Sequence, residues 1–207
     1  MKVVLYGATG NAGSRILKEL TQRGHKVIAV ARNVSNVPTG VDARLDDLSS
    51  VDKIASIIGG AEAVVSAYAP PPDEPNQLLG VTERQIAAIK IAGKARLIVV
   101  GGAGSLEVAP GVSLLASGHL PEAWVPIATS HEKALKLLQS SDINWTYFSP
   151  AAFFEPGERT GRFRLGTNEL ISNEKGESRT SMEDYAIALV DELESPSHER
   201  ARLSIGY

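Results

Sequence analysis

Short apolar runs alternate with amphipathic segments along the first half of the chain. The apolar runs span Val3–Tyr6, Val27–Ala31, Ala63–Ala67 and Leu97–Val100. Between them lie segments with helical spacing, which span Ala12–Arg23, Val51–Ile58 and Asn76–Ala92. Each of these segments is followed by glycine, a common helix stop. The order predicts a parallel sheet whose strands are joined by covering helices.

The second half continues the pattern at wider intervals. It predicts helices at Ser130–Leu138 and about Met182–Glu194, and strands at Trp145–Phe148 and Arg202–Ile205. The whole chain therefore predicts an α/β fold of the Rossmann type. We expect a doubly wound, mainly parallel sheet of six or more strands with helices on both faces.

Three segments interrupt the alternation, and each follows the carboxyl end of a predicted strand. The segment Ala69–Pro75 contains four prolines and predicts a stiff loop beside a ligand. Residues 101–129 are long and rich in glycine and proline, and residues 150–181 are similar. Because ligands bind outside the carboxyl ends of strands in such folds, we expect these segments to wall a substrate pocket.

Composition narrows the class of protein. The chain has 207 residues, which suits one domain over residues 1–207, and its net charge of -3 offers no basic excess for nucleic acid. Cysteine is absent, which excludes disulfides and zinc–thiolate sites. No apolar stretch reaches the ~18 residues that a membrane span needs, and no signal peptide is recognisable. We expect a cytoplasmic protein that binds neither nucleic acid nor membrane.

A glycine turn directly after the first strand carries the clearest chemistry. Gly7 allows a sharp turn, Gly10 leaves room for a pyrophosphate, and Gly13 lets the next helix pack close to the sheet. That helix, which begins near Asn11, directs its unpaired N–H groups at the phosphates. The pattern predicts a dinucleotide, although a purely structural turn is the alternative. The expected cofactor contacts in this region are Gly7, Thr9, Gly10, Asn11, Ala12 and Gly13, with Ser66, Ala67 and Pro150 at later strand ends.

The residues after the second and third strands indicate which dinucleotide. Arg32 stands where an acidic residue would bind the ribose of NAD, and its guanidinium suits a 2′-phosphate. NADP(H) is therefore favoured over NAD(H), unless Arg32 is a solvated surface residue. Asp47 and Leu48 can contact the adenine, Asp47 by accepting from its amine. The alternative for Asp47 is a helix N-cap.

Later motifs resemble those of one family. The Tyr-x-x-x-Lys pair of ordinary short-chain dehydrogenases is absent. Instead the chain carries the motifs Gly101–Ser105, Ala128–Lys133, Asn144–Pro150, Pro156–Gly161, Asp184–Ala186 and Asp191–Glu194. This combination resembles the NAD(P)H-flavin reductases among the atypical short-chain dehydrogenases, which are related to biliverdin reductase B and NmrA-like proteins. The resemblance covers essentially the whole chain.

The resemblance implies catalytic roles for Ser105 and His131. Ser105 could bond a substrate carbonyl or the nicotinamide amide, and His131 could supply a proton near neutral pH. The alternatives are that Ser105 caps a loop and that His131 begins a helix. Phe153 and Phe154 could face a planar substrate or pack in the core.

Two further features concern charge and metal. Arg159 and Arg162 could hold an anionic substrate tail or could be solvated. The four histidines, at positions 25, 119, 131 and 198, lack the spacing of metal ligands, so no metal is expected.

The leading hypothesis is an NADPH-dependent oxidoreductase that transfers hydride to a flavin or a similar planar conjugated acceptor. Missing tyrosine disfavours alcohol and ketone chemistry, whereas an oxidised flavin needs mainly to be stacked on the nicotinamide. The alternative is a non-catalytic NADP(H)-binding redox sensor of NmrA-like type. A sugar-nucleotide epimerase fits less well, since it needs the tyrosine and a larger C-terminal lobe. The acceptor is a small molecule, and the choice between monomer and homodimer stays open.

Overall fold

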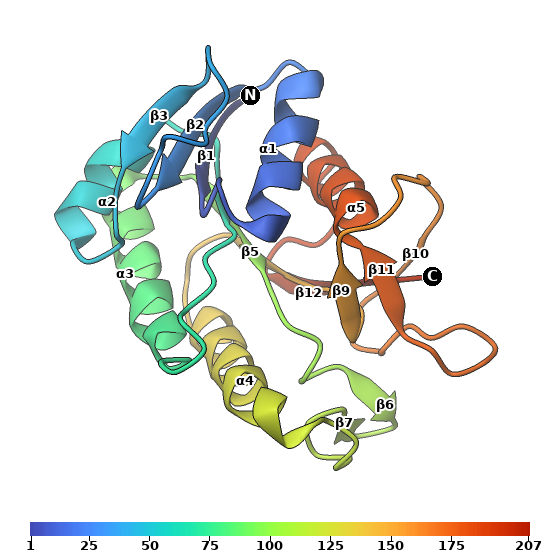
Figure 1. Cartoon of the computed structure of the whole chain (residues 1–207). Helices are drawn as coiled ribbons and strands as arrows, with labels where there is room; N and C mark the ends of the chain where they lie inside the picture. The colour runs from blue at the N-terminus through green and yellow to red at the C-terminus, as the bar shows by residue number, and fades with distance from the viewer.

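A computed structural model describes residues 1–207 and has an eight-stranded sheet at its centre (Figure 1). The strand order is β10-β12-β8-β5-β4-β1-β2-β3. Seven strands are parallel: β1 (Lys2–Tyr6), β2 (Lys26–Ala31), β3 (Asp42–Leu45), β4 (Ala63–Ser66), β5 (Arg96–Val100), β8 (Trp145–Ser149) and β12 (Ala201–Gly206). The edge strand β10 (Arg164–Gly166) runs antiparallel to β12. The predicted doubly wound α/β fold is confirmed.

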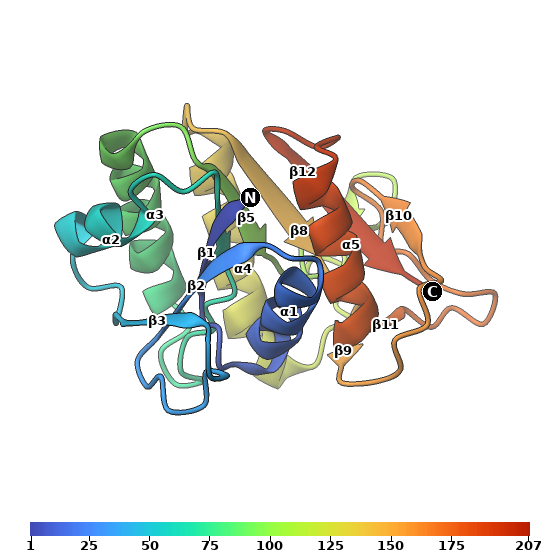
Figure 2. The ribbon, with the colours of Figure 1, turned by 90° about the horizontal axis from the view of Figure 1, so that it is seen from above.

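Helices cover both faces of the sheet, as Figure 2 shows from above. One face carries α1 (Asn11–Gln22) and α5 (Met182–Glu194), which pack against each other. The other carries α2 (Val51–Ile58), α3 (Gln77–Ala92) and α4 (Val125–Gln139).

Strand side chains point alternately to the two faces, so each face has its own apolar core. On β1, Val3 and Leu5 belong to the core beneath α1 and α5, whereas Val4 and Tyr6 belong to the core beneath α2, α3 and α4. The strands are apolar on both sides because both sides are covered.

The helix boundaries follow the sequence signals except at α4. The structure has α2 and α5 where the sequence predicts them, and serine side chains cap both. The predicted start of α4 at Ser130 is wrong. The helix begins at Val125, directly after a 3-10 turn, η1 (Glu122–Trp124). Pro126 is accepted there because N–H groups in the first helical turn have no intrahelical acceptor, so the N–H that proline lacks would form no helical hydrogen bond.

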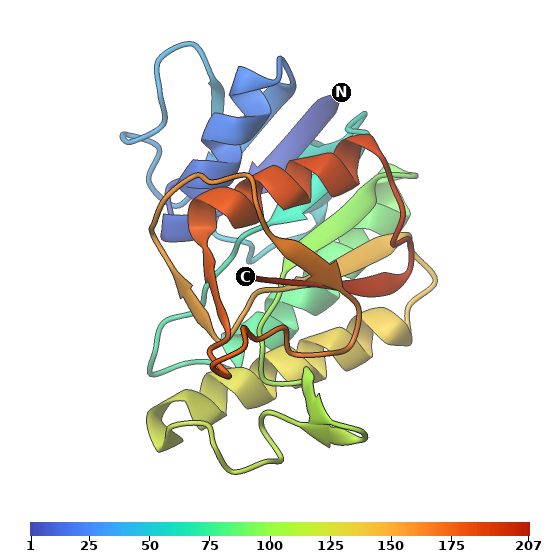
Figure 3. The same cartoon turned by 90° about the vertical axis from the view of Figure 1, so that its right-hand side faces the viewer.

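The segment 101–129 is therefore not one irregular loop. It contains a small hairpin, β6 (Glu107–Ala109) and β7 (Val112–Ser113), before it enters η1 and α4. In Figure 3 the green hairpin and the yellow helix lie below the orange and red C-terminal segment.

The C-terminal segment folds back on the molecule. Strand β9 (Phe153–Glu155) pairs with β11 (Arg179–Ser181) in a separate two-stranded sheet. The fully buried Asp184 accepts hydrogen bonds from the amides of Thr160 and Gly161, both at 2.8 Å, and from the Tyr207 hydroxyl at 2.9 Å. One carboxylate thus ties α5 to a loop and to the last residue. No helix combines the length and apolar composition needed to cross a membrane.

Candidate cofactor and substrate site

A cleft of about 510 Å³ opens at the carboxyl ends of β1, β2, β3 and β4. Many predicted cofactor residues line it: Gly7, Thr9, Gly10, Asn11, Arg32, Asp47, Leu48 and Ala67. The sheet order changes direction between β1 and β4, the switch point at which doubly wound folds bind ligands. The predicted contacts Ala12, Gly13 and Ser66 lie outside this lining, and Pro150 lines a different cavity.

The three glycines of the turn have different tasks. Gly7 has a φ of +73°, and a Cβ there would lie 2.3 Å from the Ala67 carbonyl oxygen. A Cβ on Gly13 would lie 2.0 Å from the Gly7 oxygen, so both residues are required by the fold itself. A Cβ on Gly10 would meet only the Gly7 oxygen, at 3.3 Å. With an ordinary φ of -76°, a side chain at Gly10 requires the Gly7 carbonyl to move by only a few tenths of an ångström, whereas it would take space from a ligand in the cleft that Gly10 lines.

The cleft suits a pyrophosphate. Helix α1 starts beside it with no side-chain cap and no acidic residue in its first turn. The first N–H groups of α1 and the positive end of its dipole are thus left for an anion. The residues present fit a dinucleotide cofactor at this position.

Arg32 follows β2 at the cleft wall, where it is exposed and forms no ion pair. Asp47, in the next strand connection, accepts from the Ser49 amide at 3.0 Å and from its hydroxyl at 2.6 Å. These bonds hold the pKa of Asp47 below its ordinary value. The N-cap of α2 is Ser50, so the alternative that Asp47 caps this helix is wrong.

Leu48 is buried with an unusual backbone for a residue with a side chain. Its φ is +63°, and its carbonyl accepts from Arg84 Nε at 2.6 Å. Left-handed backbone at a bulky residue is strained and concentrates at ligand sites. The sequence carried no signal of this strain, because glycine is the residue that normally marks it.

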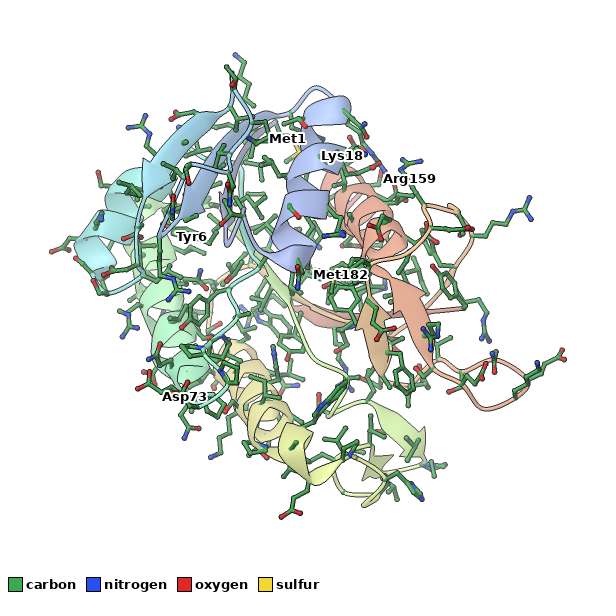
Figure 4. All side chains as sticks on the ribbon, in the orientation of Figure 1. Met1, Tyr6, Lys18, Asp73, Arg159 and Met182 are labelled. Carbon is green, nitrogen blue, oxygen red and sulfur yellow. The ribbon has the colours of Figure 1, made fainter.

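Sequence reasoning missed three aromatic or acidic residues of the cleft. Tyr6, labelled in Figure 4, ends β1 with its hydroxyl buried, and both burial and the neighbouring Asp46 raise its pKa. Tyr68 follows β4 and donates to Gln77 Oε1 at 3.0 Å. Asp46, the third missed residue, directly follows β3. The position of all three at or just after strand ends was the signal, although buried tyrosines more often serve only as core.

A second cavity of about 180 Å³ lies at the ends of β5 and β8, against α4. Its lining is mainly apolar and comes from the two predicted wall segments and α4: Gly102, Ala103, Gly104, Leu114, Leu120, Trp124, Ile127, Ala128, His131, Pro150, Ala151, Ala152 and Phe154. His131 is the one titratable side chain among these residues. The cavity suits an uncharged ring.

His131 lies in the second turn of α4, not at its start. Its Nδ1 is 3.0 Å from the hydroxyl of Tyr147, a fully buried residue of β8. Burial lowers the pKa of His131 from its ordinary value of 6.5 to about 4. Burial thus works against the expected supply of a proton near neutral pH, since desolvation favours the neutral imidazole.

Of Ser105, Phe153 and Phe154, only Phe154 lines the apolar cavity. The Ser105 hydroxyl accepts from Arg202 Nη1 at 3.0 Å and does not line the cavity. Phe153 is 48% exposed and lies beneath the Arg179 guanidinium, whereas Phe154 lines the cavity and packs on Tyr185. Adjacent strand residues point to opposite sides, so only one of the pair faces the cavity.

Arg159 and Arg162 line neither cavity. Arg159 is labelled near α5 in Figure 4, and its guanidinium pairs with the buried Glu19 of α1 at 2.9 Å. An anionic substrate tail would have to compete with this carboxylate.

Comparison with known proteins agrees with this geometry. Residues 7–196 match the family described as NAD(P)H-binding. A solved structure from Burkholderia pseudomallei, described as a "putative exported protein", is 44% identical, with all of both chains covered and a TM-score of 0.92. A Bacteroides thetaiotaomicron structure described as a "putative epimerase" is 41% identical, covering 100% of this chain and 96% of that one, with a TM-score of 0.91.

A third structure, from Streptococcus pneumoniae, is described as a "putative NADH-flavin reductase". It is 35% identical, covers 100% of this chain and 99% of that one, and has a TM-score of 0.91. The three descriptions differ, so they do not by themselves assign a reaction. The chain belongs to the NAD(P)H-binding family and has the Rossmann-type fold of its oxidoreductase-like members, as the resemblance to atypical short-chain dehydrogenases predicts.

Proposed function

We propose that the protein is an NADPH-dependent reductase that transfers hydride to a flavin or a similar planar conjugated acceptor. One observation carries the proposal: the two cavities lie over consecutive strands at the same edge of the sheet. The cleft covers β2, β1 and β4, and the apolar cavity covers the next two strands, β5 and β8. A dinucleotide with its adenosine near Arg32 and its pyrophosphate at Gly10 would extend toward the apolar cavity.

Arg32 supports the choice of NADP(H). It is exposed at the cleft and free of any carboxylate, so its charge is available to a 2′-phosphate. Of the two carboxylates that line the cleft, Asp46 has a side chain with no exposure, and Asp47 accepts from Ser49. The position directly after β2, where an acid would select the bare ribose of NAD, is taken by Arg32.

The apolar cavity supports a planar acceptor. Bound NADPH would supply the hydride. Phe154, Leu114 and Ile127 offer apolar contacts to a ring and exclude water from it. The cavity contains no tyrosine–lysine pair to donate a proton, and burial favours the neutral form of His131. We therefore assign the lining residues the role of holding and orienting the acceptor, which takes its proton from water after hydride transfer.

Loss of NADPH absorbance with riboflavin or FMN as acceptor tests the proposal. Steady turnover, absent in a Gly10→Ala variant that cannot seat the pyrophosphate, is the expected result. Tight NADPH binding without turnover of any planar acceptor would overturn it in favour of the sensor. Interconversion of a nucleotide sugar without net NADPH consumption would instead favour the epimerase.

A further inference from the structure

The apolar cavity has very few side-chain hydrogen-bonding atoms. Among its lining residues only His131 and Trp124 carry a polar side-chain atom. The Trp124 indole can only donate, whereas a neutral imidazole both donates and accepts. The state of His131 therefore decides whether any side chain of the cavity can accept a hydrogen bond from a substrate.

The Tyr147 hydroxyl has three partners on two elements. It lies 3.1 Å from the Gly102 amide, 3.1 Å from the His131 carbonyl oxygen and 3.0 Å from His131 Nδ1. The amide must donate to the hydroxyl, and the carbonyl must accept from it. A hydroxyl has one proton, so both contacts with His131 are hydrogen bonds only if Nδ1 carries a proton and donates it to the hydroxyl.

This arrangement is built into the fold. Tyr147 is fully buried, and a Cβ on Gly101 would lie 2.4 Å from its ring. A Cβ on Gly102 would lie 2.9 Å from the His131 ring. Two successive glycines after β5 thus allow the tyrosine, the histidine and the backbone to meet. The other ring nitrogen, Nε2, has no partner in the protein and is not fully buried, and the His131 side chain belongs to the cavity lining.

We propose that Tyr147 holds the His131 proton on Nδ1, so that Nε2 accepts a hydrogen bond from a ring N–H of the substrate. The substrate class is then a conjugated cyclic imide or lactam, such as the isoalloxazine of a flavin, rather than a quinone or ketone that offers only acceptors. This inference rests on the proposed reductase function. Tyr147 is a positioning residue, and His131 is the group that touches the substrate. The low pKa of His131 agrees, because it leaves one nitrogen unprotonated.

Nitrogen NMR of the imidazole tests the tautomer without any substrate. At neutral pH the wild-type protein should show a protonated Nδ1 and a bare Nε2 for His131. Tyr147→Phe should move the signals toward the other tautomer. Tyr185→Phe is the matched control: it removes another fully buried tyrosine hydroxyl, bonded to the Phe148 carbonyl at 2.8 Å, and should leave the His131 signals unchanged. A proton on Nε2 in the wild type would overturn the assignment, even if Tyr147→Phe fails to fold.

Flavin binding tests the substrate class. Lumiflavin and its N3-methyl derivative differ in the imide N–H, and their affinities for the NADP⁺-saturated protein can be measured by fluorescence quenching. The wild type should bind lumiflavin about tenfold tighter or more, because the methylated ring leaves an acceptor unpaired. Tyr147→Phe should reduce this preference, and Tyr185→Phe should retain it.

The outcomes separate the two proposals. Equal affinities for the two flavins, with steady NADPH turnover of both, would overturn the N–H assignment and leave the reductase intact. If neither flavin binds or is reduced, the proposed acceptor is overturned, while the NMR experiment still decides the tautomer.

Discussion

Arg159 and Arg32, both ligand candidates from the sequence, differ in whether a carboxylate of the protein already pairs with them. Arg159 forms an ion pair with the buried carboxylate of Glu19, which also pairs with Arg23 at 2.8 Å. Arg32 is exposed and has no carboxylate partner. The same side chain is therefore a structural tie in one place and an available ligand in the other.

Replacing Arg32 by Ala should weaken NADPH binding by ~1.5 to 3 kcal/mol, the scale of a hydrogen bond between charged groups. NADH affinity should hardly change, because NADH lacks the 2′-phosphate. Calorimetric titration of both cofactors measures this, with Arg159→Ala as the control that alters neither affinity. Equal losses for NADPH and NADH would contradict the assignment of Arg32.

The buried His131 should make stability depend on pH. Its pKa is about 4 in the folded protein and about 6.5 when unfolded, so between these values the unfolded chain binds the extra proton. Stability contributed by this group is complete above about pH 6.5 and is lost as pH falls toward 4, by about 1 to 3 kcal/mol.

Urea unfolding of the wild type and His131→Gln at several pH values checks this prediction. The difference in unfolding free energy between the two proteins should shift in favour of the variant as the solution becomes more acidic. A constant difference would show that His131 titrates normally in the folded state.

At the scale of elements, the turn between β1 and α1 combines a fold requirement with a binding requirement. Gly7 and Gly13 let the strand, the turn and the helix approach within distances that no Cβ permits. A Cβ on Gly10 has a less severe contact, 3.3 Å from the Gly7 oxygen, and Gly10 lines the cleft.

Alanine substitutions should separate these two requirements. Gly10→Ala should fold normally and lose NADPH affinity, because the new methyl group occupies pyrophosphate space. Gly13→Ala should lower the unfolding temperature strongly, since its Cβ would overlap the Gly7 carbonyl. Thermal unfolding and calorimetry on each variant measure the two effects. Normal NADPH affinity in a folded Gly10→Ala protein would mean that the phosphates do not bind at this turn.

At the scale of the whole molecule, buried polar networks join parts that are distant in sequence. Arg96 of β5 donates to the Glu192 backbone carbonyl at 3.0 Å and pairs with the Glu192 carboxylate, joining the sheet to α5. Asp184 joins the same helix to the loop at Thr160 and to Tyr207.

Replacing Asp184 by Ala should cost about 3 kcal/mol or more of unfolding free energy, because several donors lose one buried charged acceptor together. Asp191→Ala is the matched control: its half-exposed carboxylate pairs with Arg23, and its loss should cost less than about 1 kcal/mol. Chemical denaturation measures both. Since Asp184 lines neither cavity, NADPH affinity should survive in the folded variant. Similar costs for the two variants would contradict the central role of Asp184.

Structural features that depend on residues close together in the chain could be predicted from the sequence. The alternation of apolar runs and helical segments predicted the parallel sheet and α5, and glycine stops marked the ends of α1, α2 and α3. The strand, glycine turn and helix placed a cofactor cleft at the correct sheet edge, because all three constraints act within about fifteen residues. The start of α4 was missed because Pro126 suggests a break, although a first helical turn accepts proline.

Only the tertiary structure decided what each candidate side chain contacts. Arg202, distant in sequence, binds the Ser105 hydroxyl, and Glu19 binds Arg159. Strand direction separates Phe153 from Phe154. The charge and tautomer of His131 depend on burial and on Tyr147, which lies on another element. Sequence patterns report local geometry, whereas desolvation and hydrogen-bond partners arise from segments that meet only when the chain has folded.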